Sequence, residues 1–230
     1  MQLDFSGRRI VITGGTGGLG GAVVDAFLAA GARCEVTKRR PETSSRDAVR
    51  YHVVDVADES AVTKFYSQFD DLWASIHLVG GFDAGAIIDT SLEQFRKMFD
   101  INAVTCFLCC REAVKAMRKG AGAGAGGGRI VNVSSRPAVV PTGGMTGYTT
   151  SKAAVSSITQ CLAEEVKVDS ILVNAVVPSI MDTPANRAAM PKGDFSKWPQ
   201  VEEVAQTILF LASGENALTS GALVPVYGKS

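Results

Sequence analysis

Histidine is scarce in this chain, which limits the metal sites that its sequence leads us to expect. His52 and His77 are the only two histidines among 230 residues. Neither stands at a spacing from a cysteine that is typical of a zinc site, so we expect no metal centre. The cysteines number five, and Cys106, Cys109 and Cys110 share one apolar segment. An odd, clustered set favours reduced thiols that pack as small core residues, as in cytosolic proteins, over a disulfide framework.

An excess of charge of either sign is also absent, since 23 lysines and arginines balance 23 aspartates and glutamates. No overall field favours nucleic acid or an anionic membrane, and we expect neither as a partner. No apolar run is long enough to cross a bilayer. Asp4, Arg8 and Arg9 interrupt the N-terminal segment, where a secretory signal would be apolar. We therefore expect a soluble, cytoplasmic protein.

The chain does contain a regular alternation of short apolar runs and amphipathic segments. Runs rich in β-branched residues predict strands, and apolar residues at helical spacing predict helices between them. Strands that alternate with helices indicate a parallel sheet covered on both faces. We find no repeat or linker that divides 1–230, so we expect one domain, and Pro225 favours an edge position for the last strand. The predicted strands are 9–13, 34–37, 51–54, 75–79, 129–133, 171–177 and 223–226, and the longer predicted helices are 59–69, 92–117 and 148–166.

A glycine-rich turn follows the first predicted strand. The strand leads directly into Gly14-Gly-Thr-Gly-Gly18-Leu-Gly20, and an amphipathic helix follows. Glycines let the backbone approach a pyrophosphate, and the helix N-terminus offers it N–H groups and a positive dipole end. We expect Gly14, Gly18 and Gly20 to cradle a pyrophosphate; the alternative is a tight turn without a ligand. The glycine-rich stretch 120–128 has a helix before it and a strand after it, so we interpret it as a flexible surface loop without chemistry.

Tyr148 and Lys152 stand four residues apart, so a helix would place them one turn apart on one face. An ammonium beside a phenol stabilises the phenolate and lowers the pKa of the tyrosine, which would make Tyr148 a usable general acid or base. A hydroxyl of Ser135 or Ser134 would hold the substrate oxygen. The pair alone occurs by chance on many solvated helices. Here, however, the candidate groups all lie at or just after the C-terminal ends of predicted strands, the edge where ligands bind in open parallel sheets.

Taken together, the motifs resemble those of the short-chain dehydrogenase/reductase family over essentially the whole chain. The resemblance implies a doubly wound Rossmann-type domain with a seven-stranded parallel sheet in the order 3-2-1-4-5-6-7. It also implies hydride transfer between a nicotinamide cofactor and a carbonyl or alcohol, by a homodimer or homotetramer. The family usually has Asn-Asn-Ala-Gly after the fourth strand and Pro-Gly after the sixth, and this chain departs from both. The matching motifs are Thr13-Gly-x-x-x-Gly18-x-Gly20, Asp55, Asn102 in Ile-Asn-Ala, Ser135, Tyr148-x-x-x-Lys152, and Pro178 with Thr183.

The resemblance implies a role for each residue of a catalytic group. Tyr148 would donate a proton to the carbonyl oxygen or remove it from the alcohol. Lys152 would lower the pKa of Tyr148 and hold the nicotinamide ribose. Ser135 would hydrogen-bond the substrate oxygen, and Asn102 would hold a water that relays protons to Lys152. The alternatives are a turn serine for Ser135 and a helix-interior residue that bonds to backbone for Asn102. His77 is interpreted as a packed or solvated strand residue, because this mechanism leaves it no proton to move.

The same resemblance implies a set of cofactor-binding residues. Asp55 would bond the adenine amino group, or else be a strand-end acid facing solvent. Thr183 would bond the carboxamide, or else act as a helix N-cap. The full set that we expect is Thr13, Gly14, Thr16, Gly18, Leu19, Gly20, Lys38, Arg39, Asp55, Val56, Gly80, Tyr148, Lys152, Pro178 and Thr183.

The end of the second predicted strand bears on the choice of cofactor. Enzymes of this fold that prefer NAD place a carboxylate there, which bonds the ribose hydroxyls and would repel a 2′-phosphate. Here Lys38 occupies that position and Arg39 and Arg40 follow, whereas the nearest acid, Glu35, lies inside the strand. Three cations suit a phosphate, and Arg39 would also stack on adenine. We predict a preference for NADP(H), with NAD(H) possible; the alternative is a solvated basic turn.

The segment at about 180–199 has no clean periodicity, and we interpret it as a lid over the substrate. Part of it, from Asp182 to Trp198, resembles the corresponding segment of dihydropteridine reductases. Pteridine reduction is therefore an alternative to a general carbonyl or alcohol substrate. A dinucleotide-binding regulatory protein without turnover is a third hypothesis, ranked last because Tyr148, Lys152 and Ser135 are all present. The sequence does not identify the substrate or the direction of the reaction.

Overall fold

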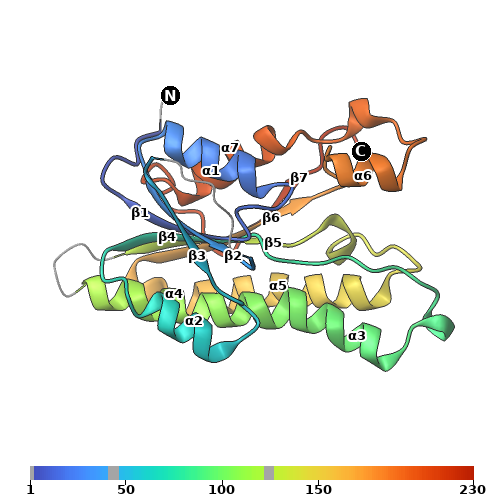
Figure 1. Cartoon of the computed structure of the whole chain (residues 1–230), viewed down its shortest axis with the longest axis horizontal. Coiled ribbons are helices and arrows are strands. Elements are labelled where there is room, and N and C mark those ends of the chain that lie inside the picture. Colours follow the sequence, from blue (N-terminus) through green and yellow to red (C-terminus); the bar gives the residue numbers. More distant parts are fainter. Residues whose placement is uncertain (1–2, 41–46, 122–126) are drawn as a thin grey trace.

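The apolar runs of the sequence pair side by side as seven parallel strands. The computed structural model describes residues 3–40, 47–121 and 127–230 (Figure 1). The strands lie in the order β3-β2-β1-β4-β5-β6-β7, with β7 at an edge. This confirms the predicted doubly wound sheet and the edge position of Pro225. The strands are β1 (Arg9–Thr13), β2 (Arg33–Lys38), β3 (Val49–Val53), β4 (Leu72–His77), β5 (Gly128–Val133), β6 (Ile171–Pro178) and β7 (Leu223–Val226).

Helices cover both faces of the sheet, as Figure 1 shows, with α1 and α7 on one side and α2, α4 and α5 on the other. Side chains alternate along each strand, so Ile10 and Ile12 of β1 pack against the α1 and α7 side, while Val11 packs against the side covered by α2, α4 and α5. A sheet buried on both faces explains why its strands read as continuous apolar runs. The helices are α1 (Gly20–Ala29), α2 (Glu59–Tyr66), α3 (Leu92–Phe99), α4 (Thr105–Ala121), α5 (Thr146–Glu165), α6 (Pro184–Ala189) and α7 (Val201–Ala212).

The predicted helix 92–117 is interrupted in the structure. A π-helical turn, Asp100–Val104, separates α3 from α4. The hydroxyl of Thr105 donates to the carbonyl oxygen of Ile101 at 2.8 Å, which satisfies a backbone acceptor at the end of this turn. The apolar periodicity continues across the turn, so it gave no sign of the extra residue that a π turn accommodates.

The predicted glycine loop 120–128 is wrong at both ends, and its middle, 122–126, lies outside the described residues. Residue Gly120 belongs to α4, where a Cβ would come within 2.4 Å of the carbonyl oxygen of Asp70. Gly128 opens β5, where a Cβ would come within 2.5 Å of Met117 Sδ. These two glycines therefore allow a close approach of packed elements rather than loop flexibility.

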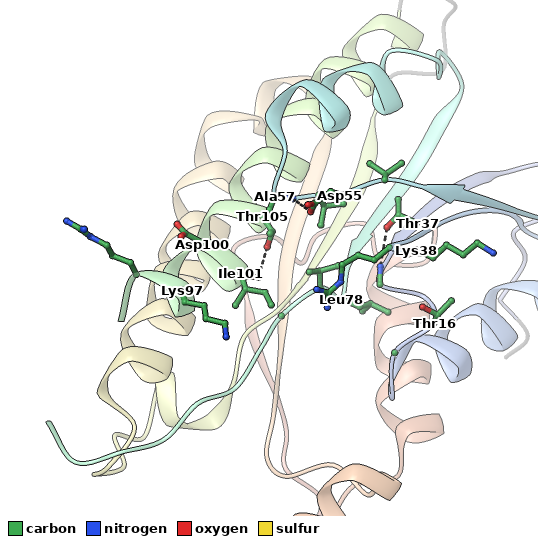
Figure 2. A pocket seen from close by; sticks show the side chains of 18 of the residues that line it. Thr16, Thr37, Lys38, Asp55, Ala57, Leu78, Lys97, Asp100, Ile101 and Thr105 are labelled. Atoms are coloured by element: carbon green, nitrogen blue, oxygen red, sulfur yellow. Dashed lines mark hydrogen bonds between the residues drawn. The ribbon is translucent and has the colours of Figure 1, made fainter. Parts of the chain in front are cut away.

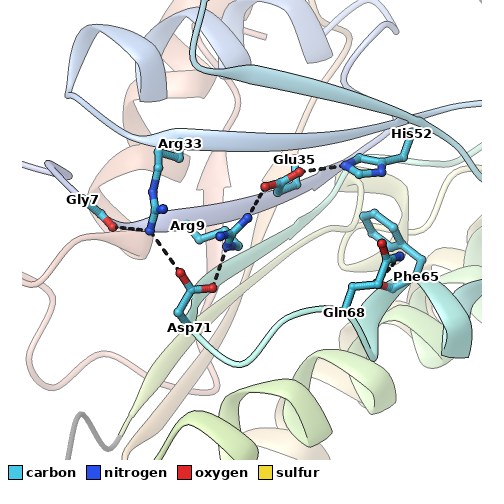
Figure 3. A network of polar contacts seen from close by, with 8 residues as sticks. All are labelled: Gly7, Arg9, Arg33, Glu35, His52, Phe65, Gln68 and Asp71. Carbon is cyan, nitrogen blue, oxygen red and sulfur yellow. Dashed lines mark hydrogen bonds and ion pairs between the residues drawn. The ribbon is translucent and has the colours of Figure 1, made fainter. Parts of the chain in front are cut away.

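A polar network connects β1, β2 and β3 with Asp71, just before β4 (Figure 3). Glu35 of β2 is buried, with only 4% of its side chain exposed; it forms an ion pair with Arg9 and a hydrogen bond with His52. The distance from His52 Nε2 to Glu35 Oε2 is 2.7 Å. Asp71 binds the other edge of the Arg9 guanidinium at 2.6 Å. Burial raises the pKa of Glu35, but His52 and Arg9 together lower it by more, so the net pKa is below its ordinary value.

No helix among the described residues is long and apolar enough to cross a membrane.

Candidate active site

The glycine turn after β1 depends on close backbone packing. Gly14 has φ +72, in the left-handed region, and its N–H donates to Thr37 Oγ1 at 3.3 Å. A Cβ on Gly20 would lie 2.5 Å from the carbonyl oxygen of Gly14, so only glycine fits where α1 begins. A Cβ on Gly18 would lie 3.3 Å from Thr183 Cγ2, which places the segment after β6 directly against this turn.

A cavity of about 840 Å³ opens beside the turn, at the C-terminal edge of the sheet (Figure 2). Thr16, Thr37 and Lys38 lie on one side of it in Figure 2, and Lys97 and Ile101 lie on the other. The volume is ordinary for a site that binds a small molecule or cofactor. The predicted cofactor residues that line it are Gly14, Thr16, Lys38, Arg39, Asp55, Val56 and Gly80.

The basic corner after β2 contains one buried and two exposed cations. Lys38 is only 7% exposed, and its Nζ lies 4.7 Å from the centre of the Tyr51 ring. Arg39 is exposed and lines the cavity, whereas Arg40 is exposed but does not line it. Glu35 is paired with Arg9 and His52, so its carboxylate does not reach this corner. The cavity wall here is therefore positively charged.

Helix α3 supplies a wall of the cavity that the sequence did not predict. Ser91 and Gln94 form a capping box that fixes the start of the helix. From there Arg96 and Lys97 add positive charge to the cavity, alongside Asp100. Their charge and helical spacing are visible in the sequence, but no local signal says which face of α3 meets the cleft. Other lining residues that were missed are Gly17, Thr37, Val54, Ala57, Leu78, Val79, Leu92, Glu93, Ile101 and Thr105.

Lys152 is buried on α5 below the end of β5. Its Nζ donates to the carbonyl oxygen of Val133 at 2.9 Å. Burial lowers the pKa of Lys152 to about 8, because a low dielectric disfavours the ammonium. Ser134 faces α5 and bonds both the backbone of Lys152 at 3.0 Å and Ser156 Oγ at 2.7 Å. Ser134 is thus held in the structure of the helix, which leaves Ser135 as the available hydroxyl.

Tyr148 stands one turn before Lys152 on α5, as its spacing predicts. Burial raises the pKa of Tyr148 above its ordinary value, and the interaction with the Ser135 side chain offsets only part of this. The expected lowering by Lys152 is therefore not found in this structure, in which the ammonium is engaged with Val133. The Phe82 ring packs edge-on against Tyr148, with centroids 4.9 Å apart, and 64% of Phe82 is exposed.

Asn102 lies in the π-helical turn and connects the end of β4 to α5. Its Nδ2 donates to the carbonyl oxygen of Gly81 and to Ser151 Oγ, both at 3.0 Å, and its Oδ1 accepts from Gly81 N at 3.0 Å. A Cβ on Gly80 would lie 2.7 Å from Asn102 Oδ1 and 3.1 Å from Lys152 Nζ. The structure thus brings Asn102 and Lys152 together against the same side of Gly80. Asn102 also bonds to backbone, which is the alternative role that its sequence position allowed.

Other predicted cofactor residues lie away from the cavity wall. Thr13 is buried in β1, and Leu19 packs in the apolar layer beneath α1 and α7. Pro178 ends β6. The Thr183 hydroxyl accepts from Asn186 N at 3.2 Å, so it caps α6, the alternative role that its sequence position allowed.

A family model, similar sequences and similar structures all relate this chain to dehydrogenases and reductases. Residues 8–194 match the family model described as short chain dehydrogenase. A short-chain type dehydrogenase/reductase from Picea abies is 30% identical, over 97% of this chain and 92% of that protein. L-xylulose reductase from Bos taurus is also 30% identical, over 99% and 98%. Among solved structures, a short-chain type dehydrogenase/reductase from Mycobacterium ulcerans has a TM-score of 0.89 at 25% identity, covering 99% of this chain and 90% of that one. ElxO with NADP bound has a TM-score of 0.86 at 26% identity, covering 96% and 97%.

Proposed function

Because the chain belongs to the short-chain dehydrogenase family and is an oxidoreductase, we propose that it transfers hydride between NADP(H) and a small carbonyl or alcohol substrate. The observation that carries this proposal is the grouping of Asn102, Lys152 and Tyr148 around the ends of β4 and β5. These three side chains do not line the cavity themselves, but Asn102 and Lys152 lie directly against Gly80, which does. The glycine turn, whose close contacts exclude a Cβ, supports a pyrophosphate at the cavity entrance. Pteridine reduction is the alternative activity, and the substrate panel described below includes it.

In the proposed mechanism Tyr148 moves the proton that accompanies the hydride supplied by bound NADPH. In the reductive direction its hydroxyl donates to the carbonyl oxygen, which Ser135 orients by a hydrogen bond. The raised pKa keeps the phenol protonated before the reaction. Lys152, with a pKa of about 8, remains mostly an ammonium at neutral pH and offers donors beyond the one that Val133 accepts. These donors would hold ribose hydroxyls and stabilise the phenolate that forms, and Asn102 would position the water that restores the proton.

The proposed preference for NADP(H) follows from the charges that line the cavity. Lys38 and Arg39 make the corner after β2 suitable for an added phosphate. Arg96 and Lys97 of α3 add positive charge on the opposite side of the cavity, where Glu93 and Asp100 also lie. NADP is the cofactor bound by the similar protein ElxO. NAD(H), which lacks the 2′-phosphate, would bind the same turn more weakly.

We further propose that 1–230 forms one nucleotide-binding domain whose segment at about 180–199 closes over the substrate, and that the chain assembles as a homodimer or homotetramer. The close approach of Gly18 to Thr183 supports the single domain with a closing segment, because it holds the segment after β6 against the glycine turn after β1. The exposed Phe107 and Val104 near the start of α4 support the second, because large apolar side chains at a helix surface favour packing against another chain.

The decisive experiment is a hydride-transfer assay with NADPH and a panel of carbonyls and quinonoid dihydropterins. Tyr148→Phe removes only the hydroxyl, so we expect turnover to fall by roughly two to four orders of magnitude with NADPH binding nearly unchanged. Tyr227→Phe is the matched control, which removes a phenol from a residue outside the catalytic group. If Tyr148→Phe keeps activity within a few-fold of the parent on every active substrate, the proposed mechanism fails.

A further inference from the structure

A second polar cluster is buried between the sheet and α4, and the proposed mechanism does not use it. His77 ends β4, Asn132 lies beside it on β5, and Cys106 and Cys110 project from α4. These four residues are between 0% and 5% exposed. One ring nitrogen of His77 and the two sulfur atoms lie within 4.8 Å of one another.

The sequence hides this cluster because its parts are distant along the chain. Cys106 and Cys110 are four residues apart on one helix, so they face the sheet together. His77 and Asn132 are direct partners in the pairing of β4 with β5, although 55 positions separate them. The expectation of no metal centre was based on the spacing of histidines and cysteines along the sequence. The fold brings His77 close to Cys106 and Cys110 despite that spacing.

We propose that His77, Cys106 and Cys110 bind one thiophilic divalent metal ion of the Zn²⁺ type. Zinc bonds of about 2.3 Å to sulfur and 2.0–2.1 Å to nitrogen, at tetrahedral angles, place neighbouring ligand atoms about 3.5–3.8 Å apart. The two sulfur atoms are 4.0 Å apart, and Cys110 Sγ lies 3.5 Å from His77 Nδ1. Two of the three ligand pairs are therefore close to the required separations before any ion is bound, and the third pair, Cys106 Sγ and a ring nitrogen of His77, lies within 4.8 Å.

The fourth position has a suitable oxygen. Asn132 Oδ1 lies 2.8 Å from His77 Nδ1 and 3.5 Å from Cys110 Sγ. Its orientation is fixed, because Asn132 Nδ2 donates to Thr159 Oγ1 at 2.9 Å, and this leaves the carbonyl oxygen facing the cluster. An opening of about 0.6 Å between Oδ1 and Nδ1, from 2.8 Å, would let both atoms contact the same ion at a tetrahedral angle.

Protons and charge balance when the ion binds. Without the ion, the proton on His77 Nδ1 is donated to Asn132 Oδ1; on binding it is transferred to Nε2, where Ser75 Oγ at 2.9 Å accepts it. Ser75 and Tyr66 share a hydrogen bond of 2.8 Å in which either hydroxyl can donate, so this chain can reverse. The two thiols each lose one proton to solvent. Two thiolates then neutralise the divalent ion, and the buried site carries no net charge.

A disulfide between Cys106 and Cys110 is the competing use of these sulfur atoms. It would require them to move from 4.0 Å to about 2.05 Å within one continuous helix. A disulfide would also not explain why His77 Nδ1 lies 3.5 Å from Cys110 Sγ. The metal site uses all three groups with smaller movements, so the geometry favours it.

The test uses Co²⁺ as a spectroscopic probe with the folded, reduced protein. Thiolate-to-cobalt charge-transfer absorption and strong visible bands report tetrahedral sulfur ligation and do not depend on enzyme activity. We expect one Co²⁺ per chain, displaced by Zn²⁺. We expect Cys106→Ser, Cys110→Ser and His77→Gln each to weaken binding at least about tenfold, since even an outer-shell partner is worth about 10- to 100-fold. Cys109→Ser, on the same helix and equally buried, is the matched control and should bind as the parent does.

Cys161→Ser provides a cysteine variant that should fold even if the variants of the buried ligands do not. Cys161 is the exposed cysteine, and its loss should leave the core intact. If Cys161→Ser retains the full cobalt spectrum and its melting temperature rises with Zn²⁺, the buried site is supported. Absence of thiolate–cobalt absorption in the folded parent, its loss in Cys161→Ser, or parent-like spectra in folded variants of all three ligands would overturn the proposal.

Discussion

Removing the positive charge of Arg39 should reduce the preference for NADPH without damaging the fold. Arg39 is exposed and lines the cavity, so Arg39→Ala removes a solvent-facing side chain at the cavity wall. Lys38 is a poorer choice, because its buried position against Tyr51 would couple any loss of binding to a loss of stability. Arg40→Ala is the matched control: it removes an adjacent exposed arginine that does not line the cavity.

The expected magnitude follows from the exposure of Arg39. A hydrogen bond to a charged group is worth about 1.5–3 kcal/mol, and solvent screening reduces this to about 1–2 kcal/mol at an exposed site. We therefore expect kcat/KM for NADPH to fall about 5- to 30-fold, with little change for NADH. The assay measures kcat/KM for both cofactors in parent, Arg39→Ala and Arg40→Ala at two salt concentrations, because higher salt should reduce the difference. A parent that favours NADH, or an equal loss for both cofactors, would refute the reasoning.

Three further predictions concern the turn, the polar network and assembly. Gly20→Ala should abolish dinucleotide binding measured by fluorescence, because its Cβ would meet the backbone at 2.5 Å, whereas Gly21→Ala, with nothing within 4 Å, should bind normally. Glu35→Gln should lower the free energy of unfolding in urea at pH 7 by about 1–3 kcal/mol, whereas Glu164→Gln, in a solvent-exposed ion pair with Lys167, should leave it nearly unchanged. The pKa of Glu35 in the folded protein lies below its ordinary value of 4.5. The stability lost in Glu35→Gln should therefore be largest above pH 4.5 and should shrink as the pH falls through the pKa of the folded state. A stability loss that does not change with pH would contradict a role for the ionised Glu35. Light scattering at micromolar concentration should give a dimer or tetramer, and a monomer would contradict the proposed assembly.

The sheet was predictable because burial on both faces leaves a strong local pattern. Most strands contain a short apolar run rich in β-branched residues, such as Arg9–Thr13 and Ile171–Pro178, so their positions are visible without knowledge of their neighbours. Tyr148 and Lys152 were equally accessible, since helical spacing alone puts them on one face. The boundaries were less exact: β4 covers 72–77 rather than 75–79, because the apolar residues after it, Leu78 and Val79, line the cavity instead of pairing.

The features that the sequence missed depend on contacts between distant segments. Arg96 and Lys97 look like ordinary solvated helix residues until α3 is placed beside the cleft. The approach of His77 to Cys110 arises from the packing of α4 on β4, which no spacing rule contains. The pKa of Tyr148 also depends on burial, and a motif-based expectation that considered only the neighbouring ammonium gave the opposite direction.

The π-helical turn at Asp100–Val104 makes this part of the chain sensitive to length rather than to side-chain identity. A π turn holds one residue more than the α-helix it interrupts. Each residue turns a helix by about 100°, so deletion of any one of these five would rotate α4 by that angle relative to α3. The deletion would break the hydrogen bonds of Asn102 to Gly81 and Ser151. It would also rotate Cys106 and Cys110 together away from the sheet. Single-residue deletions here should therefore be tolerated far less than substitutions at the exposed positions of the same turn.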